Sequence, residues 1–323
     1  MMKQYDYQSL LDSLGFETLT HTEVLQSLWG GYGELVRLHS AGGSIIVKHI
    51  KLPKPEHHPR GWNSELSHQR KLRSYQVELN WYKSAANLCQ AKVPVAIKVE
   101  QQGQDLLIAM EDLSTLGFTD VVTEATYVHL SACLEWLAYF HAQHIGHQGE
   151  GLWESGTYWH LDTRPDELAA LNDESLKQTA SKIDRVLKEA RYQTLVHGDA
   201  KLANFCFYPD GTRAAAVDFQ YIGRGCAMKD VALFMSSAVK PEKCQGMEGW
   251  ILDEYFAHLS RALDMYQPSI DAVDVEAEWR PLFSIAWADF QRFVKGWSPD
   301  HWKITPYTEA LAVHALDTLK AYP

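Results

Sequence analysis

Apolar and polar positions alternate in short runs over the first third of the chain, with the period of two residues that is typical of β-strands. Turn sequences, several of them containing glycine, separate these runs. One longer stretch instead carries apolar residues at helical spacing. The pattern predicts an antiparallel sheet interrupted by a single helix. The predicted strands span residues 24–28, 34–39, 44–50, 93–100 and 105–110, and the predicted helix spans residues 62–88.

Beyond this region the apolar spacing becomes mainly helical, so we expect a sheet-rich part followed by a mostly helical part in an α+β chain. One late helix carries five aromatic residues at helical spacing, and we expect most of them in the core. Helices are predicted at residues 126–144, 173–190, 231–239, 249–265, 275–295 and 306–322, and the aromatic residues are Trp279, Phe283, Trp287, Phe290 and Phe293.

Two apolar runs in the middle of the helical part each deliver a carboxylate, first Asp199 and then Asp218. Between them, residues 205–208 and 213–217 read as a hairpin around a Pro-Asp-Gly turn. The hairpin would bring Asn204 and Asp218 side by side at its open end. An amide oxygen and a carboxylate suit Mg²⁺, which prefers oxygen ligands and keeps several waters. Asp199 is then free to face a hydroxyl group.

A glycine-rich loop and a lysine mark the predicted sheet. Gly30, Gly31 and Gly33 lie between the first two strands, where glycine lets backbone N–H groups approach a phosphate. An ordinary hairpin turn explains these glycines equally well. Lys48 lies among apolar residues in the third strand and therefore needs an anionic partner. The alternative is a lysine that keeps an edge strand soluble.

The predicted helix supplies a partner for that lysine. Glu78 lies three residues after Tyr75 and four before Tyr82, so it borders the apolar face of the helix. We expect Glu78 to form an ion pair with Lys48. Glu65 is the rival partner, and a plain surface glutamate is the other interpretation of Glu78.

The motif His197-Gly198-Asp199, followed by Asn204 and then by Asp218-Phe219-Gln220, resembles the catalytic half of the protein-kinase-like superfamily. The His-Gly-Asp form is similar to the small-molecule branch: the aminoglycoside phosphotransferases, the choline kinases and the ecdysteroid-kinase-like proteins. The spacing of Tyr75, Glu78 and Tyr82 also resembles the last of these families. The run Ile45-Ile46-Val47-Lys48 in the third strand resembles the Val-Ala-Ile-Lys strand of kinases.

The resemblance implies a bilobal α+β fold, with an N-terminal nucleotide-binding lobe of residues 1–111 and a C-terminal catalytic lobe of residues 112–323. In related kinases the segment after the fifth strand joins the two lobes. The resemblance also implies transfer of the γ-phosphoryl group of ATP to a hydroxyl of a small molecule. In such an enzyme Asp199 orients the hydroxyl and accepts its proton, while Asn204 and Asp218 hold Mg²⁺. Lys48, held in place by an ion pair with Glu78, binds the phosphates, and the glycine loop approaches the same phosphates with its backbone N–H groups.

Further site residues follow from the same resemblance. Lys201 matches the lysine of serine/threonine kinases and would neutralise the transferring phosphoryl group, although a solvent-facing lysine is an equal alternative. Met110, Glu111 and Leu113 belong to the segment whose backbone pairs with adenine between the lobes of related kinases. The side chains of Glu111 and Asp112 would then simply be solvated.

Two buried polar residues complete the expected framework. His141 is interpreted as a structural core histidine, and Asp230 as the N-cap of the helix at 231–239, bracing the metal loop. The irregular, aromatic segment 146–171 is long enough to border a substrate site. Four charged residues are open candidates for the acceptor pocket: Asp162, Arg164, Asp289 and Arg292.

Composition narrows the function classes. The net charge of −11 argues against a general nucleic-acid surface and is compatible with a cationic or neutral substrate. No apolar run is long enough for a membrane span, and the start of the chain lacks a signal pattern. The five cysteines show no zinc spacing, which favours buried thiols in a reduced, cytoplasmic protein.

Two other function classes remain as alternatives. A regulatory pseudokinase would have lost some of the motif residues, and all of them are present. A hydrolase of α/β type would need a Gly-x-Ser-x-Gly motif, which the sequence lacks. A phosphotransferase without a long activation segment would act on a small molecule and not on a protein.

Overall fold

The computed structural model describes residues 6–28, 31–51, 65–103 and 105–322. Its first part is one antiparallel sheet with strand order β1-β2-β3-β5-β4, as the alternating pattern predicted. Strand β3 lies in the middle of this sheet, so its lysine is not at an edge. The strands are β1 (Leu19–Ser27), β2 (Gly33–Ser40), β3 (Gly43–Lys51), β4 (Ala96–Gln102) and β5 (Asp105–Glu111).

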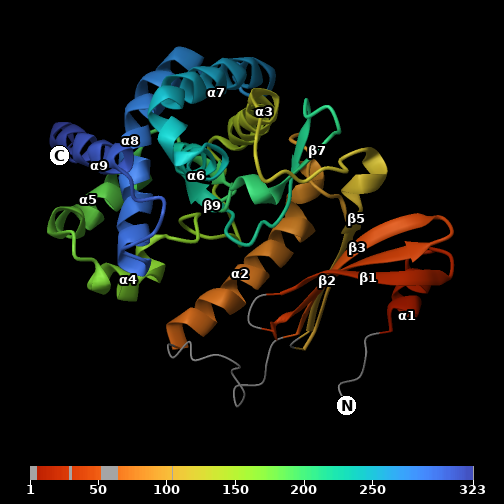
Figure 1. Ribbon diagram of the computed structural model, residues 1–323. Coiled ribbons are helices and arrows are strands. Elements are labelled where there is room, and N and C mark those ends of the chain that lie inside the picture. The colour runs from red at the N-terminus through yellow and green to blue at the C-terminus, as the bar shows by residue number, and fades with distance from the viewer. Residues whose placement is uncertain (1–5, 29–30, 52–64, 104, 323) are drawn as a thin grey trace.

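Two helices cover the two faces of the sheet. The short α1 (Tyr7–Ser13) packs on the face that carries Ile45 and Val47 of β3. The long α2 (Glu65–Ser84) lies between the sheet and the helical part of the molecule (Figure 1). Because successive side chains of a strand alternate between faces, Lys48 points to the side opposite Val47, toward α2.

Helices make up most of the second part, with two short strand pairs among them, so the α+β bilobal fold is confirmed. Helix α3 packs along α7, and α8 packs against α4, α5, α6 and α9. The helices are α3 (Tyr127–His144), α4 (Pro165–Ala170), α5 (Glu174–Glu189), α6 (Met228–Ala238), α7 (Cys244–Tyr266), α8 (Ala272–Trp297) and α9 (Pro306–Thr318), and the paired strands are β6 (Thr194–Val196) with β9 (Gly223–Gly225) and β7 (Phe205–Phe207) with β8 (Ala214–Ala216).

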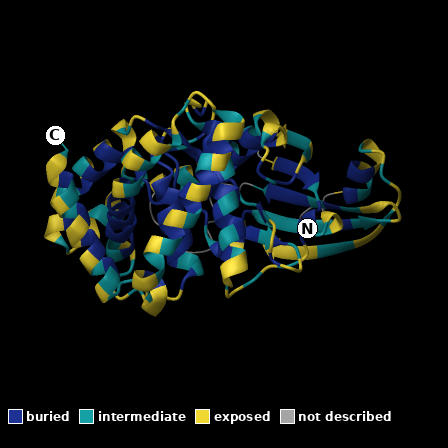
Figure 2. Cartoon of the chain, turned by 90° about the horizontal axis from the view of Figure 1, so that it is seen from above, coloured by how far each residue is buried: buried dark blue, intermediate teal, exposed yellow. Residues whose placement is uncertain are grey.

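An aromatic cluster joins α2 to the helical part. The ring of Trp81 on α2 stacks on Phe219, with 5.1 Å between ring centroids, and Trp136 and Phe140 of α3 stack on each other beside it. These rings belong to one continuous apolar core that runs from the sheet into the helices. Figure 2 shows buried residues through the middle of both parts and exposed residues on the outer helix faces. This shared core therefore holds the sheet and α2 in a fixed position relative to Phe219 and the residues next to it in the chain.

The predicted capping role of Asp230 is wrong. Helix α6 begins three residues earlier than expected, with Ala227 at the N-cap, so Asp230 lies inside its first turn. The N–H groups of Lys229 and Asp230 already bond to the carbonyls of Cys226 and Ala227. The carboxylate of Asp230 is instead turned away from its own helix.

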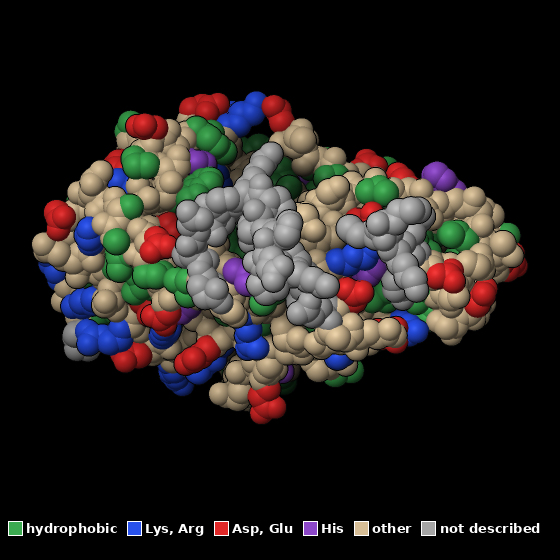
Figure 3. All heavy atoms as spheres, turned by 90° about the horizontal axis from the view of Figure 1, so that it is seen from below, with side chains coloured by type: hydrophobic (Ala, Val, Ile, Leu, Met, Phe, Trp, Pro, Cys, Tyr) green, Lys and Arg blue, Asp and Glu red, His purple; other side chains and the backbone are tan. Residues whose placement is uncertain are grey.

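Charge and burial elsewhere are unremarkable for a folded domain. On the face shown in Figure 3, acidic and basic side chains are interspersed over both parts. All five cysteines are free thiols. Within the described residues no helix combines the length and the apolar character that crossing a bilayer requires.

Candidate active site

The predicted site residues come together around a cavity of about 590 Å³ between the sheet and the helical part. Lys48 enters it from β3 and Glu78 from α2, while Asp199, Asn204 and Asp218 enter from the loops around β7 and β8. These residues are up to 170 positions apart in the sequence. The other predicted site residues in its wall are Lys201, Met110, Glu111 and Leu113.

The predicted ion pair of Lys48 with Glu78 is present. The Nζ atom of Lys48 lies 2.7 Å from Oε2 of Glu78 and 3.0 Å from Oδ1 of Asp218. Burial alone would lower the pKa of Lys48, but the charges of Asp218 and Glu78 outweigh it and raise that pKa above its ordinary value. Lys48 is therefore a buried cation that links the sheet, α2 and the loop after β8 that carries Asp218. The side chain of Glu65, the rival partner, lies outside the described residues.

Asp218 adopts a left-handed backbone conformation with φ of +67°, which only one other non-glycine residue in the described chain shares. Its Oδ1 also accepts a hydrogen bond of 2.7 Å from the amide of Gln220. Burial would raise the pKa of Asp218, but Lys48 and the nearby Lys71 and Lys201 lower it well below its usual range. The carboxylate is thus held ionised in a fixed direction.

The loop that carries Asp199 is fixed by two features. Gly198 has φ of +79°, and a Cβ there would lie 2.0 Å from the carbonyl oxygen of Tyr221, so only glycine fits. The carboxylate of Asp230 accepts hydrogen bonds from the backbone N–H groups of His197 and Gly198. His141 bonds to Asp230 and to the hydroxyl of Tyr255, which is the structural role predicted for this histidine.

Asp199 itself is buried and has two side-chain partners. Its Oδ2 accepts hydrogen bonds from Nζ of Lys201 at 2.9 Å and from the amide of Asn204 at 3.1 Å. Burial raises the pKa of Asp199, Lys201 opposes that rise, and the charge of Asp218 adds to it. A raised pKa makes this carboxylate a stronger proton acceptor than an exposed aspartate.

The donor set around Asp218 fits Mg²⁺. Because the amide nitrogen of Asn204 bonds to Asp199, its oxygen is the atom available to a metal. One carboxylate and one amide oxygen then face the same cavity. No cluster of three or more His, Cys, Asp or Glu residues in the described chain could hold a metal alone. Such a pair binds Mg²⁺ together with phosphate oxygens and not as a closed protein cage.

The structure describes only part of the predicted glycine loop. Gly30 lies outside the described residues, and neither Gly31 nor Gly33 is in the cavity wall. Gly33 has φ of +133°, and a Cβ there would lie 2.0 Å from the carbonyl oxygen of His49. Close strand approach therefore explains this glycine. The cavity wall on this side is formed by Leu25, Gln26 and Leu28.

The segment after β5 is also more constrained than predicted. Asp112 is not solvated but buried, and its Oδ2 bonds to Nε of Arg37 at 2.7 Å and to the hydroxyl of Ser44 at 2.6 Å. Glu111 pairs with Lys92 at 2.7 Å, and its backbone N–H bonds to the carbonyl of Val95. Asp112 thus anchors the connection between the two parts to strand β2.

Sequence reasoning missed Lys71 and Gln220. Nζ of Lys71 donates to the amide oxygen of Gln220 at 2.8 Å and lies over the ring of Tyr75. Burial lowers the pKa of Lys71 to about 8. The signal was available, because residues 71, 75 and 78 share one face of α2 at spacings of four and three residues.

A second, aromatic cavity of about 360 Å³ adjoins the first, and Lys71 and Tyr221 line both. Of the four open candidates only Arg164 lines it. Asp289 and Arg292 are buried and pair with each other at 2.8 Å, and Asp162 is exposed beside Lys188. We call this aromatic cavity the side pocket. The residues of its wall are Ser67, Arg70, Lys71, Tyr158, Arg164, Tyr221, Phe290, Phe293, Val294, Trp297, His301, Trp302 and Lys303.

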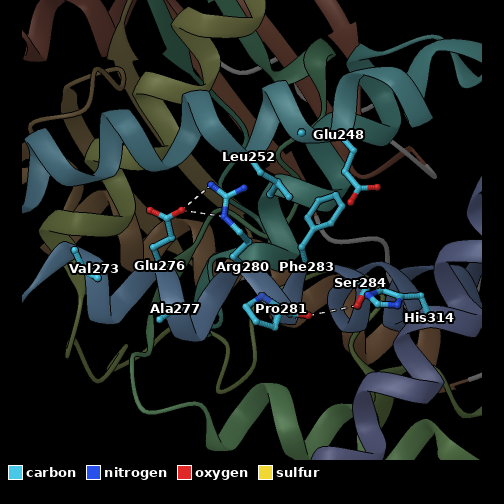
Figure 4. Close-up of a pocket in the computed structure, with 11 residues that line it drawn as sticks. Glu248, Leu252, Val273, Glu276, Ala277, Arg280, Pro281, Phe283, Ser284 and His314 are labelled. Carbon is cyan, nitrogen blue, oxygen red and sulfur yellow. Dashed lines mark hydrogen bonds and ion pairs between the residues drawn. The ribbon is translucent and has the colours of Figure 1, made fainter.

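A third hollow, of about 720 Å³, lies away from these residues between α7 and α8 (Figure 4). Arg280 projects into it and pairs with Glu276 on the same helix at 2.7 Å. His314 of α9 closes one end. None of the predicted site residues lines this hollow, so it plays no part in the assignment below.

The sequence matches the phosphotransferase enzyme family over residues 26–263, well over half of the chain. The chain belongs to that family. Its residues Lys48, Asp199, Asn204 and Asp218 all fall inside the matched range. No curated protein sequence matches the chain.

Solved structures resemble it along nearly their whole length. A microcompartment-associated aminopropanol kinase is 14% identical, with a TM-score of 0.53, covering 98% of this chain and 97% of that one. The choline kinase LicA from Streptococcus pneumoniae is 14% identical, with a TM-score of 0.44 and 98% coverage of both chains. An aminoglycoside phosphotransferase from Streptomyces rimosus is 14% identical, with a TM-score of 0.47, covering 86% of this chain and 97% of that one. The first of these similarities supports the bilobal kinase-like fold.

Proposed function

We propose that the protein is a kinase that transfers the γ-phosphoryl group of ATP to a hydroxyl of a small molecule. The observation that supports this most strongly is the convergence of Lys48, Asp199, Asn204 and Asp218 on one cavity. Three separate segments, which are strand β3, the stretch between β6 and β7 and the loop after β8, place a buried cation, a proton acceptor and two oxygen ligands around the same space. The volume of that cavity lies in the range of small-molecule sites.

The nucleotide fits the end of the cavity between β1 and the segment after β5, where Leu28, Met110 and Leu113 give an apolar wall for a base. Its phosphates then extend toward Lys48, which Glu78 holds in place. Asn204 and Asp218 would hold Mg²⁺, which supplies charge neutralisation on the phosphate oxygens when bound.

Transfer then needs positioning of the acceptor hydroxyl against the γ-phosphorus. As the new O–P bond forms, the hydroxyl proton passes to the carboxylate of Asp199, and the bond from the γ-phosphorus to the bridging oxygen breaks to release ADP. Lys201, 2.9 Å from Asp199, offers a positive charge beside the transferring group. The buried position of Asp199 excludes much of the water that would compete as acceptor.

Acceptor-dependent formation of ADP tests the proposal. The panel should contain amino alcohols, sugars, sterols, aminoglycosides and hydroxy acids, each with Mg·ATP. We expect at least one compound to stimulate ADP formation in the wild-type protein and none to do so in Asp218→Asn. Binding of ATP without stimulation by any class would favour the pseudokinase alternative.

A further inference from the structure

The side pocket opens onto the reacting groups. The backbone N–H of Tyr158, in its wall, donates to the carbonyl oxygen of Gly198, directly before Asp199. Lys71 and Tyr221 stand between the side pocket and the main cavity. A molecule in the side pocket can therefore present a hydroxyl to Asp199 while its body stays among the aromatic rings. On the proposed function, this is the place of the acceptor.

The charges of the side pocket have one sign. Arg70, Lys71, Arg164 and Lys303 are in its wall, and no described residue of that wall carries a carboxylate. Arg164 has an anionic partner behind the wall, Glu167 at 3.0 Å. The other cations bond to neutral oxygens: Arg70 to the carbonyl of Thr163, Lys71 to the amide of Gln220 and Lys303 to the hydroxyl of Ser236.

The pKa values of these cations indicate that their positive charges are only partly neutralised by the protein. Burial lowers the pKa of Lys303 to about 8; the charge of Asp199 opposes this fall, and the positive charge of Lys201 adds to it. Burial also lowers the pKa of Arg70, and the neighbouring charge of Arg164 adds to this effect. Arg70 lies near the buried Arg164, and Lys303 is half-buried. Burial of these positive charges costs free energy, which a bound anion would recover.

An aromatic pocket could instead bind a ligand cation over its ring faces. Here the protein's own cations already occupy such positions. The guanidinium of Arg164 lies 4.9 Å from the centroid of Phe293, and Nζ of Lys303 lies 5.3 Å from that of Phe290 and 5.5 Å from that of Trp302. A ligand ammonium placed over any of these three rings would meet like charge.

We propose that the acceptor is an organic anion: a hydroxyl compound whose apolar or aromatic body fills the side pocket and whose anionic group binds Arg70, Arg164 and Lys303. This inference rests on the proposed kinase function and adds the substrate class. It also reverses the expectation from net charge, because the local charge around the acceptor differs in sign from that of the whole chain.

Three probes that share a naphthalene ring and a hydroxymethyl group but carry a substituent of different charge test it: 6-(hydroxymethyl)-2-naphthoate, the corresponding neutral carboxamide and the corresponding aminomethyl compound, which is a cation. Their binding is measured by calorimetry in the presence of Mg²⁺ and a non-hydrolysable ATP analogue. We expect the carboxylate to bind roughly tenfold or more tightly than the carboxamide, and the cation to bind most weakly, as charge-assisted hydrogen bonds predict.

Two variants locate the anion site. Lys303→Met and Arg70→Met should each remove roughly tenfold of the carboxylate affinity while changing carboxamide affinity much less. Lys320→Met is the matched control, because this lysine is exposed and pairs only locally with Asp317. It should bind all three probes as the wild type does.

The outcomes separate this inference from the kinase proposal. Tightest binding of the cation, a carboxylate preference that survives in both variants, or no binding of any probe would overturn the anion assignment. ATP-analogue binding is titrated separately in the same samples. If the nucleotide binds and the carboxylate shows no advantage, only the substrate class is wrong, whereas absent nucleotide binding contradicts the kinase function itself.

Discussion

Asp199 is the residue on which the proposed chemistry depends most directly. Asp199→Asn removes the proton acceptor but keeps the size of the side chain, so Mg·ATP affinity should stay within a few-fold while kcat falls by at least ~10². Steady-state kinetics and nucleotide titration measure the two effects. Asp317→Asn, at an exposed carboxylate, is the control and should behave as wild type. Unchanged turnover in Asp199→Asn would remove Asp199 from the mechanism.

The pair of Lys48 and Glu78 supports a second prediction. Lys48→Ala and Glu78→Ala should each lower kcat/KM for ATP, and the double variant should lose less than the sum of the two, by about 0.5–3 kcal/mol of coupling. Coupling is expected because the two charges are buried and in direct contact. The partly exposed pair Lys98 and Glu100 in the same sheet provides the control, whose removal should leave kcat/KM unchanged. Strict additivity for Lys48 and Glu78 would mean that the pair does not hold the phosphates together.

At the residue scale, the ionic partner of a charged residue could be predicted where the neighbouring residues in the sequence are apolar. Lys48 needed an anion because its strand neighbours are apolar, and Glu78 bordered the apolar face of the helix. Asp112 could not be recognised as buried, because its partners Arg37 and Ser44 come from strands far earlier in the chain. The periodicity of a segment says which face is buried but not which distant polar group lies behind it.

At the scale of elements, the loop before Asp199 and helix α6 form one unit through Asp230. Asp230→Ala leaves the buried N–H groups of His197 and Gly198 without an acceptor, which costs about 1–3 kcal/mol for each. We therefore expect a clear fall in Tm together with a fall in kcat. Thermal unfolding and turnover under saturating Mg·ATP and acceptor measure the two.

A true N-cap gives the matched control for this prediction. Asp271 caps α8 by accepting from the N–H of Val273 at 2.8 Å, and its removal should cost about 1 kcal/mol without changing kcat. Equal effects of Asp230→Ala and Asp271→Ala on both quantities would show that Asp230 does not position the catalytic loop. The sequence analysis placed Asp230 at the N-cap because it put the start of this helix three residues too late. Helix starts predicted from spacing are uncertain by a few residues.

At the scale of the whole molecule, the order of alternating and helical patterns was enough to predict a sheet-rich part followed by a mostly helical part. The side pocket could not be predicted in the same way. Its wall combines residues of α2, of the irregular segment around Tyr158, of α8 and of the segment that follows it. Only the packing of α8 against α4 and α6 brings these segments together, and no local pattern encodes that packing.

The proposed metal site also belongs to this scale, because it would need both parts of the molecule and the nucleotide. Asp218 is ionised, yet it is already engaged by Lys48 and Gln220, and only the oxygen of Asn204 accompanies it. We therefore expect weak Mg²⁺ binding to the protein alone and much tighter binding once the phosphates of a non-hydrolysable ATP analogue add their oxygens. Calorimetric titration of Mg²⁺ with and without the analogue measures this difference.

Asp218→Asn is the variant that tests the metal ligand, since asparagine tolerates the left-handed backbone conformation at this position better than alanine does. It removes the charge that attracts Mg²⁺ while keeping the shape of the side chain, so the strengthening by the analogue should disappear and Tm should stay close to that of the wild type. Asp210→Asn, at an exposed turn, is the control and should retain the strengthening. If Asp218→Asn binds Mg²⁺ as tightly as the wild type in the presence of the analogue, the metal lies elsewhere. The roles proposed for Asn204 and Asp218 would then both be wrong.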